Sequence, residues 1–337
     1  MKAVVIKEIG DVDQLLFEEA PLPEAGKGEV VIRLKYAAMN RRDVFVRKGQ
    51  YPGIKFPAIP GADGAGVVVS IGSDVTEIEI DAEVVINPAL NWGDNPRHTS
   101  REFSIIGVPT DGTHAQFIKV PAENVFKKPA HLTWQEAAAL PLGGLTAFRA
   151  LFTRGMIRSG ETLVIPGIGG GAATFLLQMA TAAGARVFVT SGDNNKIEKA
   201  KELGAIDGVN YHSENWTKQL KAMTGGTDIS IDTIGGDTFN QLVTLAKPGS
   251  RIVTFGATSG PSANVVIPMI FLKQLDILGT TMGTPDEFKA MLHFYEKNKI
   301  HPVIDKVFSL EQIKEAHEYM EKGNQFGKIV LEIPQQD

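Results

Sequence analysis

The stretch "VIPGIGGGAA", Val164–Ala173, decides the fold of this chain. An apolar run leads directly into four glycines, and a helical pattern follows from about Gly171. A strand that turns through glycines into a helix leaves backbone N–H groups free at the helix N-terminus, where a phosphate binds. The stretch therefore predicts the dinucleotide-binding turn of a βαβ unit, with a tight turn that binds no ligand as the alternative.

The positions of the G-x-G-x-x-G pattern can be assigned within this stretch, with two registers open for its first two glycines. Counting back from an expected helix end at Gly184 places Ala173 at the third position. Alanine is tolerated there because that residue packs the helix against the strand. The cofactor-binding residues predicted for this loop are Gly167, Gly169, Gly170, Gly171, Ala172 and Ala173.

Strands and helices alternate on both sides of this loop, from Thr162 to about Gly283. Apolar runs such as "ARVFVTS" and "DISIDTIGG" are separated by helical patterns such as "NKIEKAKELG", "NWTKQLKAMTGG" and "TFNQLVTLAKPG". This alternation predicts an α/β fold with a doubly wound parallel sheet, the Rossmann arrangement.

The first 126 residues have a different pattern. Short Val- and Ile-rich runs such as "EVVIRLKYAA" are separated by Gly, Pro and Asp, which predicts a compact β-barrel-like domain. The last apolar run, "GKIVLEI", is expected to return to the sheet of that domain. Residues 1–126 with 285–337 are therefore assigned to a catalytic domain, and residues 127–284 to the nucleotide-binding domain.

Capping boxes mark three helix starts, at Thr133 with Glu136, Thr284 with Glu287, and Ser309 with Gln312. The first of these helices is expected to break in two at Pro141 and the pair Gly143-Gly144.

Composition limits the class of protein. A chain of 337 residues favours two domains, and 43% hydrophobic with 22% charged residues is typical of a globular protein. No window reaches the roughly 18 apolar residues of a membrane helix, and the N-terminus does not resemble a signal peptide. The absence of cysteine excludes thiolate chemistry, so a cytoplasmic enzyme is expected. The net charge of −5 gives no basic surface for nucleic acid.

The strand after the glycine loop ends at Ser191, where NAD-binding proteins carry an acidic residue for the ribose hydroxyl. A small hydroxyl leaves room for a 2′-phosphate, which Lys196 and Tyr211 are placed to contact. Asp193 favours NAD instead, because it lies only two residues beyond Ser191 and its carboxylate is another candidate for binding the ribose hydroxyl. The sequence favours NADP(H), with NAD as the alternative. For Lys196 the alternative is an ordinary solvated helix residue that contacts no cofactor.

The whole chain resembles the medium-chain dehydrogenase/reductase superfamily, and specifically its zinc-less quinone oxidoreductase-like branch. The motifs that carry the resemblance are the glycine loop, "NRRDVFVRKGQYP", "PGADGAGVV", "EAAALPLGGLTAFRAL", "KAKELGAIDGVNY" and the terminal "GKIVL". The resemblance implies a GroES-like catalytic domain beside the Rossmann domain, and a homodimer by analogy.

The resemblance also implies that zinc is absent. Zinc-dependent members carry Cys and His at positions that match Asn40 and Ala62, and the cysteine-rich lobe is replaced around His98, which is expected on the surface. Without a Lewis acid, oxidation of a plain alcohol is difficult, whereas a quinone or an α,β-unsaturated carbonyl accepts hydride readily.

Site residues follow from the same motifs. Asn40 and Tyr51 match positions that line the substrate cleft, and Tyr51 matches a proposed proton donor of enoyl-thioester reductases, with simple ring packing as its alternative. Thr146 matches a threonine that faces the nicotinamide, with a core role as its alternative. Gly256 and Met282, with Gly279 as another candidate, match strand ends beside the cofactor.

Three functions remain open on the sequence. The first is an NADPH-dependent reductase of quinones or enones, the second a 2-enoyl-thioester reductase, and the third an NADPH-binding protein without catalysis. Two departures from the family pattern bear on them: "EIEIDAEVV" lacks the usual Gly-Asp, and the loops 91–106 and 258–272 match nothing diagnostic of a substrate. The apolar run "GPSANVVIPMIFLKQ" is expected to line a pocket or to form a subunit contact.

Overall fold

A computed structural model describes residues 1–335 of the chain. The chain divides into two compact units. Unit 1 comprises Met1–Gly143 and Gly283–Asp337, and unit 2 comprises Gly144–Met282.

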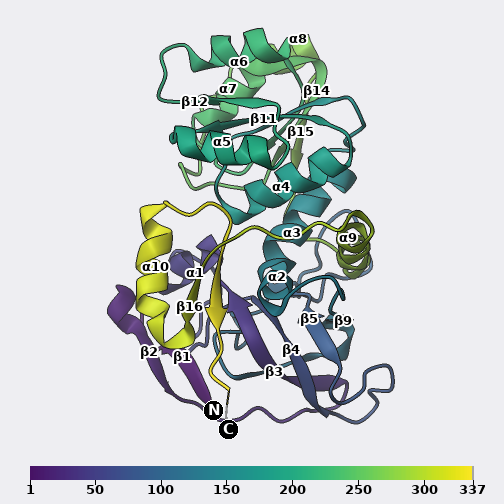
Figure 1. Ribbon diagram of the computed structural model, residues 1–337, viewed down its shortest axis with the longest axis vertical. Coiled ribbons are helices and arrows are strands. Elements are labelled where there is room, and N and C mark those ends of the chain that lie inside the picture. The colour runs from purple at the N-terminus through teal and green to yellow at the C-terminus, as the bar shows by residue number, and fades with distance from the viewer. Residues whose placement is uncertain (336–337) are drawn as a thin grey trace. The chain divides into compact units, whose positions relative to one another are not determined.

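Unit 2 is built on a six-stranded parallel sheet with the strand order β12-β11-β10-β13-β14-β15 (Figure 1). The strands are β10 (Thr162–Ile165), β11 (Arg186–Ser191), β12 (Asp207–Asn210), β13 (Thr227–Asp232), β14 (Ala246–Thr254) and β15 (Asp276–Gly279). The helices are α4 (Gly171–Ala182), α5 (Asn194–Glu202), α6 (Trp216–Thr224), α7 (Thr238–Leu245) and α8 (Ile267–Lys273). The order reverses between β10 and β13, so the predicted doubly wound sheet is confirmed and its switch point lies beside the glycine loop.

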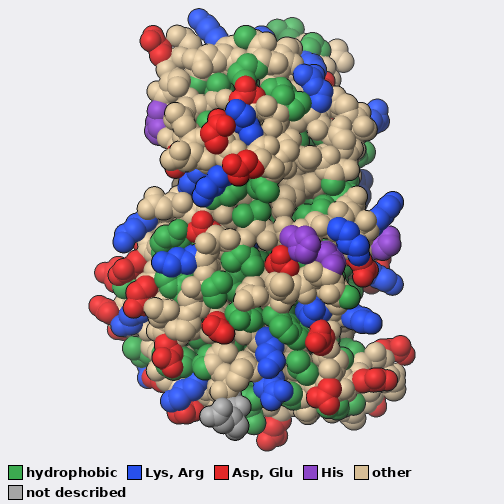
Figure 2. Space-filling view, viewed as in Figure 1, with side chains coloured by type: hydrophobic (Ala, Val, Ile, Leu, Met, Phe, Trp, Pro, Cys, Tyr) green, Lys and Arg blue, Asp and Glu red, His purple; other side chains and the backbone are tan. Residues whose placement is uncertain are grey.

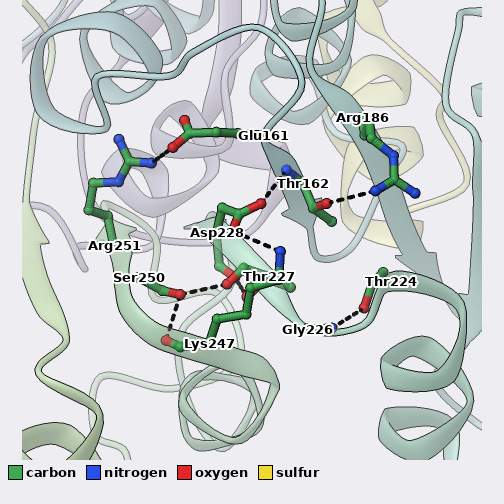
Figure 3. Close-up of polar contacts among 11 residues, drawn as sticks. Glu161, Thr162, Arg186, Thr224, Gly226, Thr227, Asp228, Lys247, Ser250 and Arg251 are labelled. Atoms are coloured by element: carbon green, nitrogen blue, oxygen red, sulfur yellow. Dashed lines mark hydrogen bonds and ion pairs between the residues drawn. The ribbon is translucent and has the colours of Figure 1, made fainter.

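A polar network joins the amino ends of the strands in this sheet (Figure 3). Asp228 accepts hydrogen bonds of 2.8 Å from the Thr162 amide and from the Lys247 ammonium. Arg251 pairs with Glu161 and donates to the carbonyl oxygens of Gly155 and Met156 at 2.7 and 2.9 Å. Ligands of doubly wound sheets bind at the carboxyl ends of the strands. This network therefore lies at the end of the sheet opposite the candidate site and has a structural role.

Unit 1 contains a mainly antiparallel sheet with the order β16-β17-β3-β4-β5-β9, and β8 pairs with β3 as well. Its strands are β3 (Glu29–Ala38), β4 (Asp63–Ile71), β5 (Glu83–Ile86), β8 (Phe117–Pro121), β9 (Val125–Lys127), β16 (Ile304–Ser309) and β17 (Lys328–Glu332). Two small ladders join β1 (Lys2–Ile6) to β2 (Leu15–Glu19) and β6 (Ala89–Leu90) to β7 (Ser104–Ile105). The terminal strand β17 pairs with β3, as the sequence predicts.

Three helical segments of unit 1 begin at the capping boxes that the sequence predicts. The helices of this unit are α1 (Arg41–Arg47), α2 (Trp134–Ala139), α9 (Pro285–Asn298) and α10 (Ile313–Lys322), and a 3-10 turn, Leu310–Gln312, precedes the last one. The capping boxes of Thr133 and Thr284 are both formed, and Ser309 forms the third before the 3-10 turn. The helix α1 was not predicted.

The predicted break at Gly143-Gly144 is wrong. α3 (Pro141–Phe148) runs through both glycines, and a π-helical turn, Arg149–Arg154, follows it. The break predicted at Pro141 is confirmed, since α2 ends before Leu140 and α3 begins at Pro141. Pro141 has no N–H to donate and is suited to the first position of a new helix.

Five further strands and helices were not predicted from the sequence: β2, β7, β9, β16 and α8. The turn that lacks the family's Gly-Asp has Asp81 in the left-handed region, with φ of 67°. Asp tolerates that conformation better than most residues do, so this turn does not require glycine.

The surface gives two further facts. Acidic and basic side chains are interspersed on the face drawn in Figure 2. Within residues 1–335, no helix is long and apolar enough to cross a membrane.

Candidate functional site

The glycine loop of unit 2 has the backbone that its sequence requires. Gly167 and Gly169 have φ of 65° and 131°, values that side chains strongly disfavour. Gly170 is the N-cap of α4, no side chain caps the helix there, and a Cβ on Gly170 would meet no heavy atom within 4 Å. The first amide groups of α4 therefore face an open position, which fits the pyrophosphate of a dinucleotide.

Burial distinguishes the two alanines of the loop. Ala173 is buried, whereas Ala172 is only half-buried. Since the third position of the pattern packs the helix against the strand, the burial favours Ala173 for it. The loop itself is held against the neighbouring strands, because the Ile168 amide donates to the Thr190 carbonyl oxygen and a Cβ on Gly167 would overlap the Ile234 side chain.

Polar groups gather where β11 ends. The Ser191 hydroxyl oxygen is buried and accepts a hydrogen bond of 3.1 Å from the Asp193 amide. The Asp193 carboxylate caps α5 by accepting from the Asn195 amide at 2.8 Å. The Asp193 carboxylate, which was the candidate ribose ligand of an NAD site, is therefore engaged in capping the helix.

Tyr211 follows the neighbouring strand β12, beside the end of β11, and is followed by His212, which was not predicted from the sequence. A Cβ on Gly192 would lie 2.6 Å from the Tyr211 hydroxyl oxygen and 2.8 Å from Nε2 of His212. Both groups therefore approach the backbone directly after Ser191. His212 follows Tyr211 in "VNYH", and its position beside a predicted phosphate ligand is the signal that could have found it. Lys196 is half-buried in the first turn of α5.

Two of the predicted nicotinamide-side residues meet in unit 2. The buried Thr146 hydroxyl lies 3.7 Å from the Met282 sulfur. Met282 has φ of 37°, an unusual conformation for a residue with a side chain. A Cβ on Gly256 would overlap the Thr233 carbonyl, so only glycine fits at that strand end.

Asn40 lies in unit 1, within a buried polar cluster that also contains Asp63 and Lys328. The Lys328 ammonium donates to the Met39 carbonyl oxygen at 2.8 Å, to Asn40 Oδ1 at 2.9 Å and to Asp63 Oδ2 at 2.9 Å. The Asn40 amide donates to the same Asp63 oxygen at 2.9 Å, and the Leu142 backbone amide donates to Asp63 Oδ1 at 2.7 Å. Neither Asp63 nor Lys328 was predicted as a site residue, although each lies in a motif that carries the family resemblance.

Burial sets the electrostatics of this region. Burial raises the pKa of Asp63, and the Lys328 ammonium, the Asn40 amide and the Leu142 amide act against that rise. Burial also raises the pKa of Asp43, against the nearby Arg42 charge. The pKa of His114 is lowered to about 3, mainly by burial. The region is therefore one of low polarity in which each charge depends on its neighbours.

Tyr51 has its ring packed rather than free. The Arg42 guanidinium lies 4.6 Å from the ring centroid, and the ring also packs against the core of unit 1. The buried Arg42 donates to the Ile106 carbonyl oxygen at 2.8 Å. Within residues 1–335 no hydrogen bond joins Tyr51 to Asn40, so the two predicted residues are not directly connected.

The side chains at the matched zinc-ligand positions do not fit a zinc ion. Ala62 is buried and has no donor atom, and the Asn40 oxygen already accepts from an ammonium group. A cation beside Lys328 would also be repelled by it. In the part of the chain that the structure describes, no three His, Cys, Asp or Glu side chains are grouped to hold a metal. His98 is exposed and bonds to Asn95 and to the Thr99 carbonyl oxygen.

Comparisons with known proteins agree with both units. Residues 26–130 match the model of the alcohol dehydrogenase GroES-like domain, and residues 168–297 match that of the zinc-binding dehydrogenase family. A zinc-type alcohol dehydrogenase-like protein of Schizosaccharomyces pombe is 36% identical, over 99% of this chain and 99% of that protein. An acryloyl-coenzyme A reductase of Sulfurisphaera tokodaii is 30% identical, over 98% of this chain and 99% of that protein.

A solved structure is similar throughout. The crystal structure of an NAD-dependent alcohol dehydrogenase has a TM-score of 0.93 and 36% identity, over 99% of this chain and 100% of that chain. The expected fold, a Rossmann domain with a GroES-like domain, is confirmed. The chain belongs to the medium-chain dehydrogenase/reductase superfamily and is an oxidoreductase with an NAD(P)-binding fold.

Proposed function

We propose that the protein is a zinc-independent, NADPH-dependent reductase whose acceptor is a quinone or an α,β-unsaturated carbonyl compound. The observation that carries the proposal is the state of Asn40, whose amide oxygen is occupied by Lys328 at the position where zinc-dependent relatives need a thiolate. Without a metal to stabilise an alkoxide, an acceptor that is already polarised suits the site best.

For the two domains we keep the boundaries expected from the sequence, whereas the compact units divide the chain after Gly143 and after Met282. Residues 127–284 bind the cofactor, and residues 1–126 with 285–337 form the catalytic domain. The loop Gly167–Ala173 holds the pyrophosphate at the N-terminus of α4. When bound, the dinucleotide supplies the hydride.

The choice of NADP(H) over NAD is supported by the end of β11. Ser191 presents a hydroxyl in place of a carboxylate, and Asp193 is engaged as the cap of α5. Tyr211 and His212 both approach the backbone at Gly192, and Lys196 follows in the next helix. These groups offer hydrogen-bond donors and positive charge to a 2′-phosphate. The name of the structurally similar NAD-dependent alcohol dehydrogenase points the other way, so both nucleotides belong in the assay.

The roles of the catalytic residues follow from their chemistry. The Asn40 amide donates a hydrogen bond to the carbonyl oxygen on which negative charge develops. The Tyr51 hydroxyl is a hydrogen-bond donor and delivers the proton to the reduced product. In unit 2, Thr146 contacts Met282, and we assign it to the nicotinamide of the bound cofactor.

A second candidate is a 2-enoyl-thioester reductase, which the similarity to an acryloyl-coenzyme A reductase favours. A panel of quinones, enals, enones and enoyl thioesters, each assayed with NADPH and with NADH, tests both candidates. Preference for a thioester together with a loss of about a hundredfold on Tyr51→Phe would favour the second. NADPH binding without turnover on any acceptor would contradict both and favour the non-catalytic alternative.

We also propose that the protein is a homodimer joined through unit 2. The strand β15 is the last in the sheet order, so one side of its backbone is left for another strand. The neighbouring helix α8 exposes Ile267, Phe271 and Leu272, at 60%, 61% and 73%. A second copy related by a two-fold axis would cover this apolar surface and extend the sheet.

A further inference from the structure

The buried cluster of Asn40, Asp63 and Lys328 is held by the central strands of unit 1. Lys328 is the first residue of β17, Asp63 the first of β4, and Asn40 follows β3 and precedes α1. The strand β3 pairs with both of the others, with Ala38 opposite Asp63 on one side and Val330 on the other. The geometry of the cluster is therefore set by a sheet and not by loops.

Both charged groups of the cluster are extensively hydrogen-bonded within it. The Lys328 ammonium has three protons and donates three hydrogen bonds. The Asp63 carboxylate accepts three, from the ammonium, the Asn40 amide and the Leu142 amide. The positive charge of Lys328 and the negative charge of Asp63 compensate each other, so the pair adds no net charge beside Asn40.

The position of Asn40 between a cation and an anion fixes the direction of its side-chain amide. The amide oxygen accepts from the ammonium, and the amide nitrogen donates to the carboxylate. In the flipped amide, the NH₂ group would face the ammonium and the oxygen would face the carboxylate. That arrangement would lose two charge-assisted hydrogen bonds and create two repulsive contacts. One amide direction is therefore strongly preferred.

We propose that Lys328 and Asp63 are positioning residues that hold the Asn40 amide with its second N–H available to the carbonyl oxygen of the acceptor. This proposal rests on the proposed function, because it assumes that Asn40 touches the acceptor. The Asn40 nitrogen carries two protons, and Asp63 accepts one of them. A donor that is already oriented stabilises developing charge without reorganising during the reaction.

Lys328 has a second effect on the same donor. Its ammonium polarises the Asn40 amide through the oxygen, which strengthens the amide N–H as a donor. It also neutralises Asp63, whose unpaired charge would oppose a developing oxyanion nearby. The pair therefore acts on the acceptor through Asn40 and does not touch it.

The test replaces the pair by neutral side chains of similar size, in the double variant Asp63→Asn/Lys328→Met. Removing both charges avoids leaving one of them buried and alone, so the fold is expected to survive. The matched control is Lys128→Met. Lys128 is also a buried lysine of unit 1, which donates to the Leu132 carbonyl oxygen at 3.0 Å and pairs with Glu83 at 3.3 Å.

Kinetics separate positioning from a purely structural role. Asn40→Ala is expected to lower kcat by about a hundredfold, as for other lost oxyanion donors. The double variant is expected to lower kcat by at least about tenfold, with the KM for NADPH within about twofold. Adding Asn40→Ala to the double variant is expected to give the value of Asn40→Ala alone, because all three residues act on one donor. Lys128→Met is expected to keep the wild-type kcat.

A second readout is independent of activity. In NMR spectra of ¹⁵N-asparagine-labelled protein, assigned with Asn40→Ala, the Asn40 NH₂ group should show one proton protected from exchange. The double variant should reduce that protection, because the amide oxygen that replaces the carboxylate is a weaker acceptor. Wild-type kcat in the double variant, a loss that multiplies with that of Asn40→Ala, or unchanged protection would each overturn the proposal. If the wild-type protein reduces no acceptor on the panel, the proposed function fails, and the NH₂ protection still decides whether the pair holds the amide.

Discussion

Lys328 and Asp63 form an ion pair of 2.9 Å whose side chains are 3% and 0% exposed. The single variant Lys328→Met leaves the Asp63 carboxylate buried without a counter-charge. We expect it to lower the free energy of unfolding by about 3–5 kcal/mol, measured by urea denaturation. Lys27 and Asp74 form a pair of similar length whose side chains are 79% and 63% exposed, and Lys27→Met should have little effect. Equal effects of the two variants would contradict this account of the buried pair.

His114 should make the protein sensitive to acid. Its pKa is lowered to about 3 in the folded protein, while that of an unfolded histidine is about 6.5. Between these values only the unfolded chain takes up the proton, so the free energy of unfolding falls as the pH falls from about 6.5. Each such histidine contributes about 1.4 kcal/mol per pH unit.

The variant His114→Asn should therefore show a shallower loss of stability between pH 6.5 and pH 4.5 than the wild-type protein. The pKa of His317 is lowered in the same direction, whereas the raised pKa values of Asp43 and Asp63 act in the opposite one. For this reason the comparison is between variants, by urea denaturation at each pH. His98→Gln, at an exposed histidine, is the control. The same slope in His114→Asn and the wild-type protein would show that His114 does not carry the effect.

Ser191 should control the choice of nucleotide. In Ser191→Asp a carboxylate replaces the hydroxyl at the end of β11, where it repels a 2′-phosphate and accepts from a ribose 2′-hydroxyl. We expect kcat/KM for NADPH to fall by at least about tenfold while that for NADH is kept or rises. Ser159→Asp adds the same charge at the amino end of the sheet and should leave the ratio unchanged. A wild-type preference for NADH would refute the NADP(H) assignment directly.

The exposed face of α8 should hold two copies of the chain together. Leu272→Glu places a charge at the most exposed of its apolar side chains, and we expect a monomer by light scattering after gel filtration. Leu22→Glu in unit 1 changes another exposed leucine and should leave the dimer intact. A monomeric wild-type protein, or a dimer that survives Leu272→Glu, would rule out this interface.

The sequence predicts the architecture of unit 2 well because local signals and tertiary structure agree there. Gly167–Ala173 joins β10 to α4 as expected, and the return of β17 to the first sheet is confirmed. The elements that were missed lack such signals. α8 begins in an apolar run that contains proline, and β16 pairs with β17 only through the folded chain. Gly143 and Gly144 show the converse, since helix packing overrides their weak helix preference.

The candidate site was predictable only in part. Asn40, Ser191 and Tyr211 lie in motifs, and the sequence gives their chemistry. The partners of Asn40 were not visible, because Asp63 and Lys328 are 265 positions apart in the chain and meet only through the pairing of β3 with β4 and β17. The sequence also did not show whether the Asp193 carboxylate caps α5 or faces the cofactor. The structure shows that it accepts from the Asn195 amide.

The central claim is that the reaction proceeds without zinc, and a single assay tests it most directly. The purified protein is treated with a strong chelator, its metal content is measured, and its oxidation of NADPH by quinones and enones is followed. We predict turnover that is unchanged by the chelator and a zinc content far below one ion per chain. Loss of activity in the chelator with recovery on adding zinc, or stoichiometric bound zinc, would contradict the account.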